Sequence, residues 1–120
     1  MSERISIHAA YASVVEDDED GFLFIGFAEG EEEDEPYVLF RQALDGGPVW
    51  FEVNDESFGA EEAVQSVAIT PDGLAITIAP EAVARFGFAS VVTVLIGPDC
   101  EDATDGIKAL RAMLGPRIAG

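Results

Sequence analysis

The sequence predicts an α+β domain: a mostly antiparallel sheet of six or seven strands, one short helix and a C-terminal amphipathic helix. Three observations lead to this fold class. The chain has 120 residues, 48% of them hydrophobic, which suits a single domain with one core over residues 1–120. Short β-branched and aromatic runs alternate with turn signals rich in Gly and Pro. The C-terminal segment then changes to the period of a helix.

The first half of the chain contains four strand-like segments. Residues 4–15 alternate loosely between apolar and polar, and form one bent strand or two short ones. Residues 22–28 are a continuous apolar run, which predicts a strand buried on both faces or nearly so. Further strands are expected at residues 37–42 and, after a Gly-Gly-Pro turn, at residues 49–54. The polar segment 55–60 is expected to be an irregular loop.

The second half begins with a hairpin. Strands at residues 64–70 and 74–79 are joined by a Pro-Asp-Gly turn, and the second strand alternates as a half-buried strand does. Residues 80–86 start with Pro and stop before Gly87, which predicts one or two helical turns. The strongly β-branched segment 91–96 is expected to be the last strand.

The C-terminal segment reads as an amphipathic helix. Its apolar positions recur at spacings of four, three and four, at Ala103, Ile107, Leu110 and Leu114. Asp102, followed three residues later by Asp105, resembles an N-cap pairing, and Gly115 ends the helix. Gly106 weakens the helix by about 1 kcal/mol relative to Ala, so packing must hold it.

The charge balance limits the classes of partner. The chain carries 24 acidic side chains against 6 basic ones, a formal net charge of −18. A nucleic-acid binder needs a large cationic patch, which so few basic residues do not provide. Anionic membrane surfaces are excluded by the same sign argument. We therefore expect neither nucleic acid nor membrane as a partner, and a protein partner that is basic.

The cysteine count and the N-terminal residues bear on localisation. One Cys cannot form an internal disulfide, so nothing indicates an oxidising compartment. No apolar run reaches the roughly 18 to 20 residues that cross a bilayer. Residues 1–15 lack the cationic start and continuous apolar stretch of a signal peptide. We expect a cytoplasmic protein.

The acidic residues are concentrated in one half of the chain. Residues 1–62 carry 18 acidic and 2 basic side chains, whereas residues 63–120 carry 6 and 4. Most of the excess lies in two runs, at residues 16–20 and 29–35. A solvated surface or adaptation to high salt is the plainer explanation, but salt adaptation should acidify the whole surface. The asymmetry favours one acidic face with a role.

Few residues could carry catalysis. The only His is His8, and the only Cys is Cys100, whose acidic neighbours Asp99, Glu101 and Asp102 disfavour a thiolate. Nucleophilic catalysis needs a nucleophile and a base within reach, and zinc needs several His or Cys ligands. We therefore expect no enzyme, no cofactor and no metal centre.

One acidic run resembles the start of a calcium-binding loop. Residues 16–21 place carboxylates at loop positions one, three and five, with Gly at position six. The twelfth position, which should be a bidentate Glu, is Phe27, and a strand is expected where a helix should follow. A weak cation site, or a minor enzymatic role for these carboxylates, is the third-ranked function.

The most informative cluster follows the Gly-Gly-Pro turn. On a strand, Trp50, Glu52 and Asn54 share one face while Phe51 and Val53 share the other. If Phe51 and Val53 point to the core, the opposite face presents an aromatic ring, a carboxylate and an amide, which is typical of an interface anchor. The alternative is an ordinary strand with a solvated face and a partly covered Trp.

A wider pattern links these segments. It comprises the strands at 37–41 and 50–55, Gly59, the hairpin strand 74–78, the short helix 80–86 and the helical positions Ile107, Leu110 and Leu114. Over about residues 20 to 115 this pattern resembles the predicted bacterial immunity proteins numbered ten in the polymorphic-toxin classification. Its most specific piece is an aromatic-x-Glu-x-Asn string, matched by Phe51 or its neighbour Trp50, then Glu52 and Asn54. The chain departs from the family's Tyr/Phe-Gly-Gly element with Phe58-Gly59-Ala60, and its connection between residues 41 and 50 is shortened.

The resemblance implies a non-enzymatic protein that binds and blocks a toxin from a competing or sister cell. Such a protein protects its producer from within the cytoplasm, and an acidic surface suits a basic, nuclease-like toxin domain. Trp50, Glu52 and Asn54 are the expected central anchors, with a rim formed by Asp55, Glu31, Glu32, Glu33, Asp34 and Glu35. The main alternative is a small acidic domain that forms a homodimer or binds a basic host protein, with no toxin involved.

Overall fold

The structure is a computed structural model that describes residues 3–30 and 35–119. Within these residues the chain forms a nine-stranded sheet with the order β5-β4-β3-β2-β1-β8-β7-β6-β9. The strands are β1 (Glu3–Asp17), β2 (Phe22–Ala28), β3 (Tyr37–Ala43), β4 (Trp50–Val53), β5 (Asp55–Glu61), β6 (Val64–Thr70), β7 (Gly73–Ile78), β8 (Ala89–Glu101) and β9 (Ile118–Ala119). The helices are the 3₁₀ helix η1 (Pro80–Phe86), α1 (Ala103–Leu114) and the 3₁₀ turn η2 (Gly115–Arg117).

The α+β class is confirmed, but the predicted number of six or seven strands is wrong. The segment expected to be an irregular loop is β5, which pairs with β4 through Phe51↔Ala60 and Glu52↔Gly59. Its polar, Gly-containing sequence has little strand signal of its own, so the pairing arises from its neighbour. The two-residue β9 lies after the helix and pairs in parallel with β6, and it is too short to be read from periodicity.

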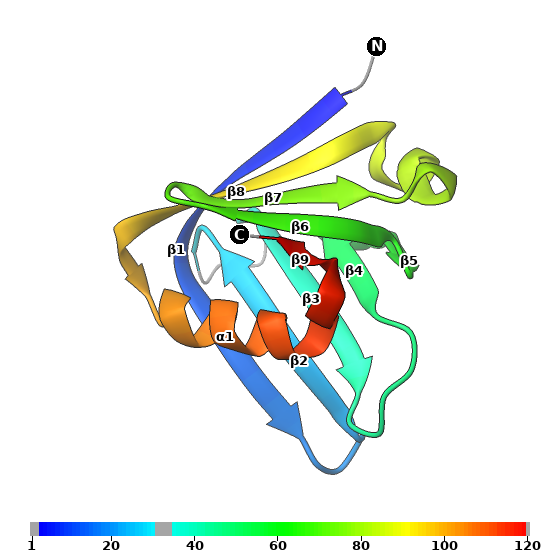
Figure 1. The fold of residues 1–120 in the computed structure, drawn as a ribbon, viewed down its shortest axis with the longest axis vertical. Helices are drawn as coiled ribbons and strands as arrows, with labels where there is room; N and C mark the ends of the chain where they lie inside the picture. Colours follow the sequence, from blue (N-terminus) through cyan, green and yellow to red (C-terminus); the bar gives the residue numbers. More distant parts are fainter. Residues whose placement is uncertain (1–2, 31–34, 120) are drawn as a thin grey trace.

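Two long strands occupy the middle of the sheet. β1 and β8 run parallel to one another. The pairs among β1–β5 on one side, and the pairs of β8 with β7 and of β7 with β6 on the other, are antiparallel, whereas β9 pairs with β6 in parallel. β8 extends well beyond the predicted segment 91–96 at both ends. The sheet is strongly bent, and α1 crosses in front of β1 and β2 (Figure 1).

The core lies inside the bend. The rings of Phe40 and Phe51 pack with centroids 4.8 Å apart, and Phe51 meets Phe86 of η1 at 5.6 Å. From β7 on the other half of the sheet, Leu74 and Ile76 are fully buried, as the predicted alternation requires. Because η1 packs against both β5 and β8, it joins the β5 edge of the bent sheet to its middle.

Helix α1 has the predicted bounds but not the predicted cap. Asp102 adopts a left-handed backbone conformation with φ of 59° and makes no side-chain cap hydrogen bond. The packing around Gly106 explains why a glycine stands inside the helix. A Cβ at this position would lie 2.9 Å from the Ala12 Cβ and 3.1 Å from the Phe27 ring. Close approach of the helix to β1 and β2 therefore requires glycine at this position.

Strand β2 is buried on one face only, which corrects the prediction of burial on both. Ile25 and Phe27 point into the core and are fully buried. Phe22, Phe24 and Gly26 point the other way and are partly exposed. The helices make their contacts elsewhere, since α1 packs beside Phe27 and η1 meets β5 and β8.

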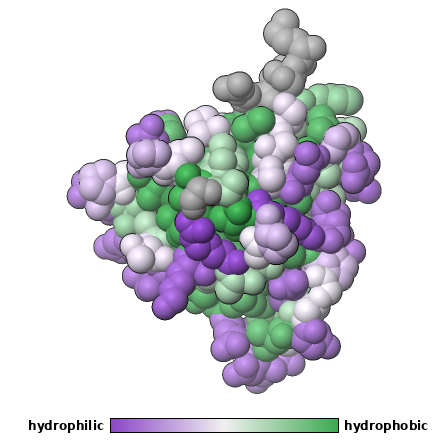
Figure 2. All heavy atoms as spheres, viewed as in Figure 1, coloured by the Kyte–Doolittle hydropathy of each residue, from purple (hydrophilic) through white to green (hydrophobic). Residues whose placement is uncertain are grey.

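The side of the molecule on which α1 lies has both hydrophilic and hydrophobic residues at its surface. Hydrophilic residues surround hydrophobic ones and gather at the tip of the β1–β2 hairpin, at the bottom of the view (Figure 2). Asp17 organises that tip: its Oδ1 accepts hydrogen bonds from the backbone N–H groups of Glu19 and Asp20. Among the described residues, no helix has the length and apolar character needed to cross a membrane.

Candidate functional site

The register of the strands gathers a set of residues on the convex side of the sheet. We call the positions on β1–β5 that point away from the core the outer face. Its central members are Tyr11, Ser13, Val15, Phe22, Phe24, Gly26, Ala28, Tyr37, Leu39, Arg41, Trp50, Glu52 and Gly59. One cross-strand row runs Ser13, Gly26, Leu39, Glu52, Gly59, and the next runs Val15, Phe24, Arg41, Trp50. Aromatic and aliphatic side chains thus dominate a face that no described helix covers.

Glu52 lies at the centre of the polar part of this face. Its Oε1 accepts a hydrogen bond from the Trp50 Nε1 at 2.8 Å, and its Oε2 accepts one from the Tyr37 hydroxyl at 2.5 Å. Glu52 is 7% exposed, and it is the one charged side chain among the described residues that is buried. Neither donor carries a positive charge, so these two residues hold the carboxylate by hydrogen bonds and not by an ion pair.

Tyr37 is locked as a hydrogen-bond donor. Burial raises the pKa of its phenol well above the usual value, and the adjacent Glu52 carboxylate raises it further. Deprotonation would place two negative charges in contact, so the hydroxyl stays protonated at every physiological pH. Tyr37 therefore holds one oxygen of Glu52 in a fixed place.

Trp50 is held from two sides. A Cβ on Gly59 would lie 2.5 Å from the Trp50 ring, so only glycine on β5 lets the indole lie flat across that strand. The Arg41 guanidinium lies 5.2 Å from the centroid of the Trp50 ring and 5.4 Å from that of Phe22, within cation–π range of both. The indole N–H is thereby aimed at Glu52.

The predicted face of β4 is partly confirmed. Phe51 and Val53 are buried while Trp50 and Glu52 point away from the core, as the alternation predicts. Asn54 does not continue the alternation, because it forms the turn between β4 and β5 with φ of 66°. Its Oδ1 accepts a hydrogen bond from the Tyr37 backbone N–H at 3.0 Å. Asn54 therefore positions Tyr37 instead of standing free on the strand face.

The predicted acidic rim is seen in part. Asp55 is exposed, and its Oδ1 accepts a hydrogen bond from the Ser57 N–H at 2.8 Å, which holds the pKa of Asp55 below its usual range. Glu52, Asp55 and Glu56 line one shallow hollow of about 310 Å³ together with Tyr37 and Asn54. Glu35 lies near the other side of Tyr37, and the remaining predicted rim residues, Glu31, Glu32, Glu33 and Asp34, lie outside the described residues.

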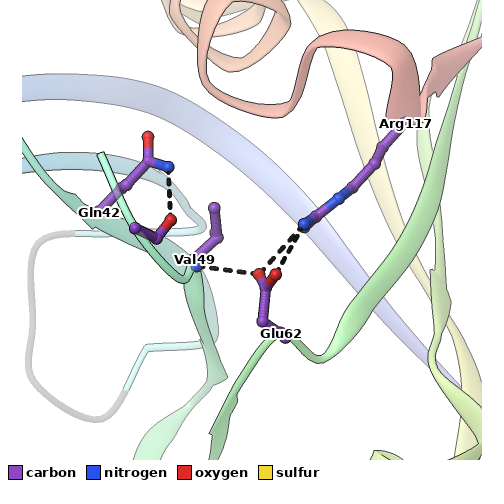
Figure 3. Close-up of polar contacts among 5 residues, drawn as sticks. Gln42, Val49, Glu62 and Arg117 are labelled. Atoms are coloured by element: carbon purple, nitrogen blue, oxygen red, sulfur yellow. Dashed lines mark hydrogen bonds and ion pairs between the residues drawn. The ribbon is translucent and has the colours of Figure 1, made fainter.

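A second carboxylate fixes the start of β4, and with it Trp50. Glu62 Oε2 accepts a hydrogen bond from the Val49 N–H at 3.0 Å, and its two oxygens lie 2.9 and 3.1 Å from the Arg117 Nη2 (Figure 3). The hydrogen bond from the Val49 N–H lowers the pKa of Glu62 most, and Arg117 lowers it further. Glu62 therefore ties the β4 end of the sheet to η2.

Tyr37 and Arg41 were missed as site residues in the sequence. The alternation of β3 places Tyr37, Leu39 and Arg41 on one face, and that signal was available. Their contact with Glu52 and Trp50 depends on the register Leu39↔Glu52. The connection between β3 and β4 is too long for a turn type to set that register, so sequence alone could not supply it.

The residues considered for catalysis lie apart from this face. His8 is on β1, and its backbone N–H donates to Glu29 Oε2. Burial raises the pKa of the Cys100 thiol, and Asp102 and Glu101 raise it further, in the direction predicted from its neighbours. No group of three or more His, Cys, Asp or Glu residues in the described part of the chain is arranged to hold a metal ion.

The outer face thus combines aromatic side chains, a fixed buried carboxylate and acidic neighbours. Such a combination can bind a partner by burying its apolar side chains and pairing its cations. Comparison with protein-family models, curated proteins and solved structures finds no match to this chain.

Proposed function

We propose that the protein is an immunity protein that binds a bacterial toxin domain through the outer face and blocks it in the cytoplasm of the producing cell. Two lines of support are combined here. Residues 20 to 115 resemble the immunity-protein family, and the outer face offers a fixed carboxylate beside aromatic side chains. The toxin domain is basic, and it is held by contacts to Trp50, Glu52 and Asp55. The protein acts by occupying the toxin's surface and performs no reaction of its own.

The observation that carries the proposal is the carboxylate of Glu52. It is buried, hydrogen-bonded by Trp50 and Tyr37, and bordered by the hollow that Asp55 and Glu56 line. A pre-positioned carboxylate is a good acceptor for a Lys or Arg side chain, because its geometry is fixed before binding. Trp side chains are among those that concentrate binding energy at the centres of interfaces, and Trp50 adjoins this carboxylate.

The charge distribution supports a cationic partner. The net charge of residues 1–62, which form β1–β5, is −16, from 18 acidic and 2 basic residues. A field of this sign speeds the approach of a basic protein and repels anionic competitors. The rim carboxylates act mainly on the association rate, whereas Trp50 and Glu52 act on the dissociation rate.

The main rival is a homodimer or a complex with another basic host protein. A homodimer through the outer face would bring together two surfaces of the same sign, so its association would strengthen with added salt. Binding to a basic toxin domain would weaken with added salt. The direction of the salt effect therefore separates toxin binding from the homodimer, and protection of cells from the toxin separates it from a complex with another basic protein.

The experiment that tests the proposal is protection of cells from the toxin. Where a secretion-linked toxin gene lies beside this gene, the C-terminal domain of its product is expressed in bacteria with the wild-type protein, with Trp50→Ala or with Glu52→Gln. Wild type should restore growth and both variants should restore it poorly. Glu101→Gln, an exposed carboxylate on β8, is the matched control and should protect like wild type. Failure of the wild-type protein to protect, or equal protection by all four, would overturn the proposal.

A further inference from the structure

A second hollow lies on the outer face, on the other side of Tyr37 from Glu52. It has a volume of about 380 Å³, and Tyr11, Ser13, Gly26, Tyr37 and Leu39 line its outer-face side. This volume is within the range of pockets that take an organic group. Among the described residues, Glu35 is the one charged side chain in its lining. Because Tyr37 lines both hollows, the two meet at this one side chain.

Gly26 forms the floor of this hollow, and the fold does not require glycine there. The residue has no positive φ, and it pairs in register with Ser13 on β1 and Leu39 on β3 without a bulge. A Cβ at Gly26 would come within 3.3 Å of the Ser13 Oγ, an exposed hydroxyl that can turn, and its other neighbours lie at ordinary contact distances. Glycine in a strand interior weakens the strand, and it often marks a place where another molecule approaches closely.

We propose that the Gly26 hollow receives an apolar side chain of the partner protein, next to a cationic side chain that enters the Glu52 hollow. The inference rests on the proposed binding of a basic partner. It adds the spacing of the two side chains, one apolar and one cationic, that the partner presents. In an extended segment, residues two apart point to the same side and lie about 6 to 7 Å from one another. The partner segment therefore has the pattern apolar-x-cationic.

The charges around the hollow fit this occupant. Glu35 borders the apolar hollow, and Glu52, Asp55 and Glu56 line the hollow beyond Tyr37. Arg41, the cation of the outer face, lies instead between the rings of Phe22 and Trp50. When a partner covers an apolar hollow, the acidic side chains around the hollow lose water. A partner with cationic side chains compensates this cost by pairing with them.

The test uses three short capped peptides and amide chemical shifts of the full-length protein. The peptides are Ser-Phe-Ser-Arg-Ser, Ser-Ser-Ser-Arg-Ser and Ser-Phe-Ser-Glu-Ser. The first should shift the amide signals of Gly26 and Leu39 and the indole signal of Trp50. The second should shift the signals around Glu52 alone, with affinity lower by about tenfold, because it lacks the apolar anchor. The third should shift neither set.

A substitution that fills the Gly26 hollow gives a second test of the inference. Gly26→Val adds a β-branched residue that suits a strand, so the variant should fold at least as stably as wild type. It should reduce the affinity for the Phe–Arg peptide to that of the Arg-only peptide. Gly97→Val, at an exposed strand glycine with open space around it, is the matched control and should bind as wild type does.

The outcomes separate this inference from the proposed function. Equal shifts from the first two peptides, or unchanged binding by Gly26→Val, would overturn the apolar hollow and leave a cationic partner in place. Binding of the Phe–Glu peptide as tight as that of the Phe–Arg peptide would overturn the paired arrangement. No shift from either Arg peptide would count against both the inference and the proposed function.

Discussion

Glu52 joins two other residues, Tyr37 of β3 and Trp50 of β4, into one unit. Tyr37 and Trp50 each donate to one of its oxygens, while Asn54 holds the backbone of Tyr37 and Gly59 makes room for Trp50. Burial of a carboxylate is costly unless its oxygens accept hydrogen bonds, and here both do. A carboxylate fixed in this way can accept a partner's cation without rearranging, which is why we propose a binding role for the site.

Gly59→Ala tests how Trp50 is held. The new methyl group would overlap the indole, since the distance would be 2.5 Å, so the ring must turn and its hydrogen bond to Glu52 must break. We expect a loss of about 1 to 3 kcal/mol in the free energy of unfolding, together with a shift in the tryptophan fluorescence maximum. Gly97→Ala, which meets no atoms, is the control. Unchanged fluorescence and stability in Gly59→Ala would contradict this packing.

At the level of elements, α1 is fitted to the sheet by its glycine. Gly106→Ala gains about 1 kcal/mol of helix propensity but places a methyl group against Ala12 and Phe27. The Ala12 Cβ is fixed to the backbone, so the overpacking cost of about 1 to 3 kcal/mol should exceed the gain. We expect a net loss of stability in urea denaturation. Thr104→Ala, at an exposed position of the same helix, is the control and should cause no loss of stability. Stabilisation by Gly106→Ala would show that the helix lies farther from β1.

The contact between Glu62 and Val49 gives a pH dependence. A carboxylate with a lowered pKa in the folded state stabilises the fold at pH above its unfolded value of 4.5, and this contribution is lost as the pH falls through the lowered pKa. Wild type should therefore be slightly more stable than Glu62→Gln near neutral pH, and the difference should vanish in acid. The side chain is 51% exposed, so the difference is small. A difference that persists at low pH, in denaturation measured across pH, would contradict the assignment.

The elements could be predicted unevenly from the sequence. β2 and β6 lie at their predicted residues because turn residues bound short apolar runs, and α1 does so because its helical period is strong. β5 was missed because its strand character comes from pairing with β4 and not from its own residues. The Trp50–Glu52 face followed from alternation, whereas Tyr37 joined it only through a register that no short turn specifies.

For the whole molecule, charge opposes compactness. A net charge of −18 on 120 residues, most of it in the half that forms β1–β5, produces repulsion within the folded state. Raising sodium chloride from about 20 to about 500 mM shortens the Debye length severalfold and should raise the Tm. Scanning calorimetry of the wild-type protein checks this. A Tm that falls with salt would mean that attractive pairs, and not repulsion, dominate the surface.

The account as a whole depends on the outer face binding a cationic partner. The most direct measurement uses the C-terminal domain of a secretion-linked toxin whose gene lies beside this one. Its affinity for the wild-type protein, Trp50→Ala, Glu52→Gln and the control Glu101→Gln is measured by calorimetry at about 50 and about 300 mM salt. We predict that wild type and the control bind alike, that both lose affinity at the higher salt, and that the two outer-face variants bind at least about tenfold more weakly. Absence of binding at low salt, or equal affinity of all four proteins, would contradict the account.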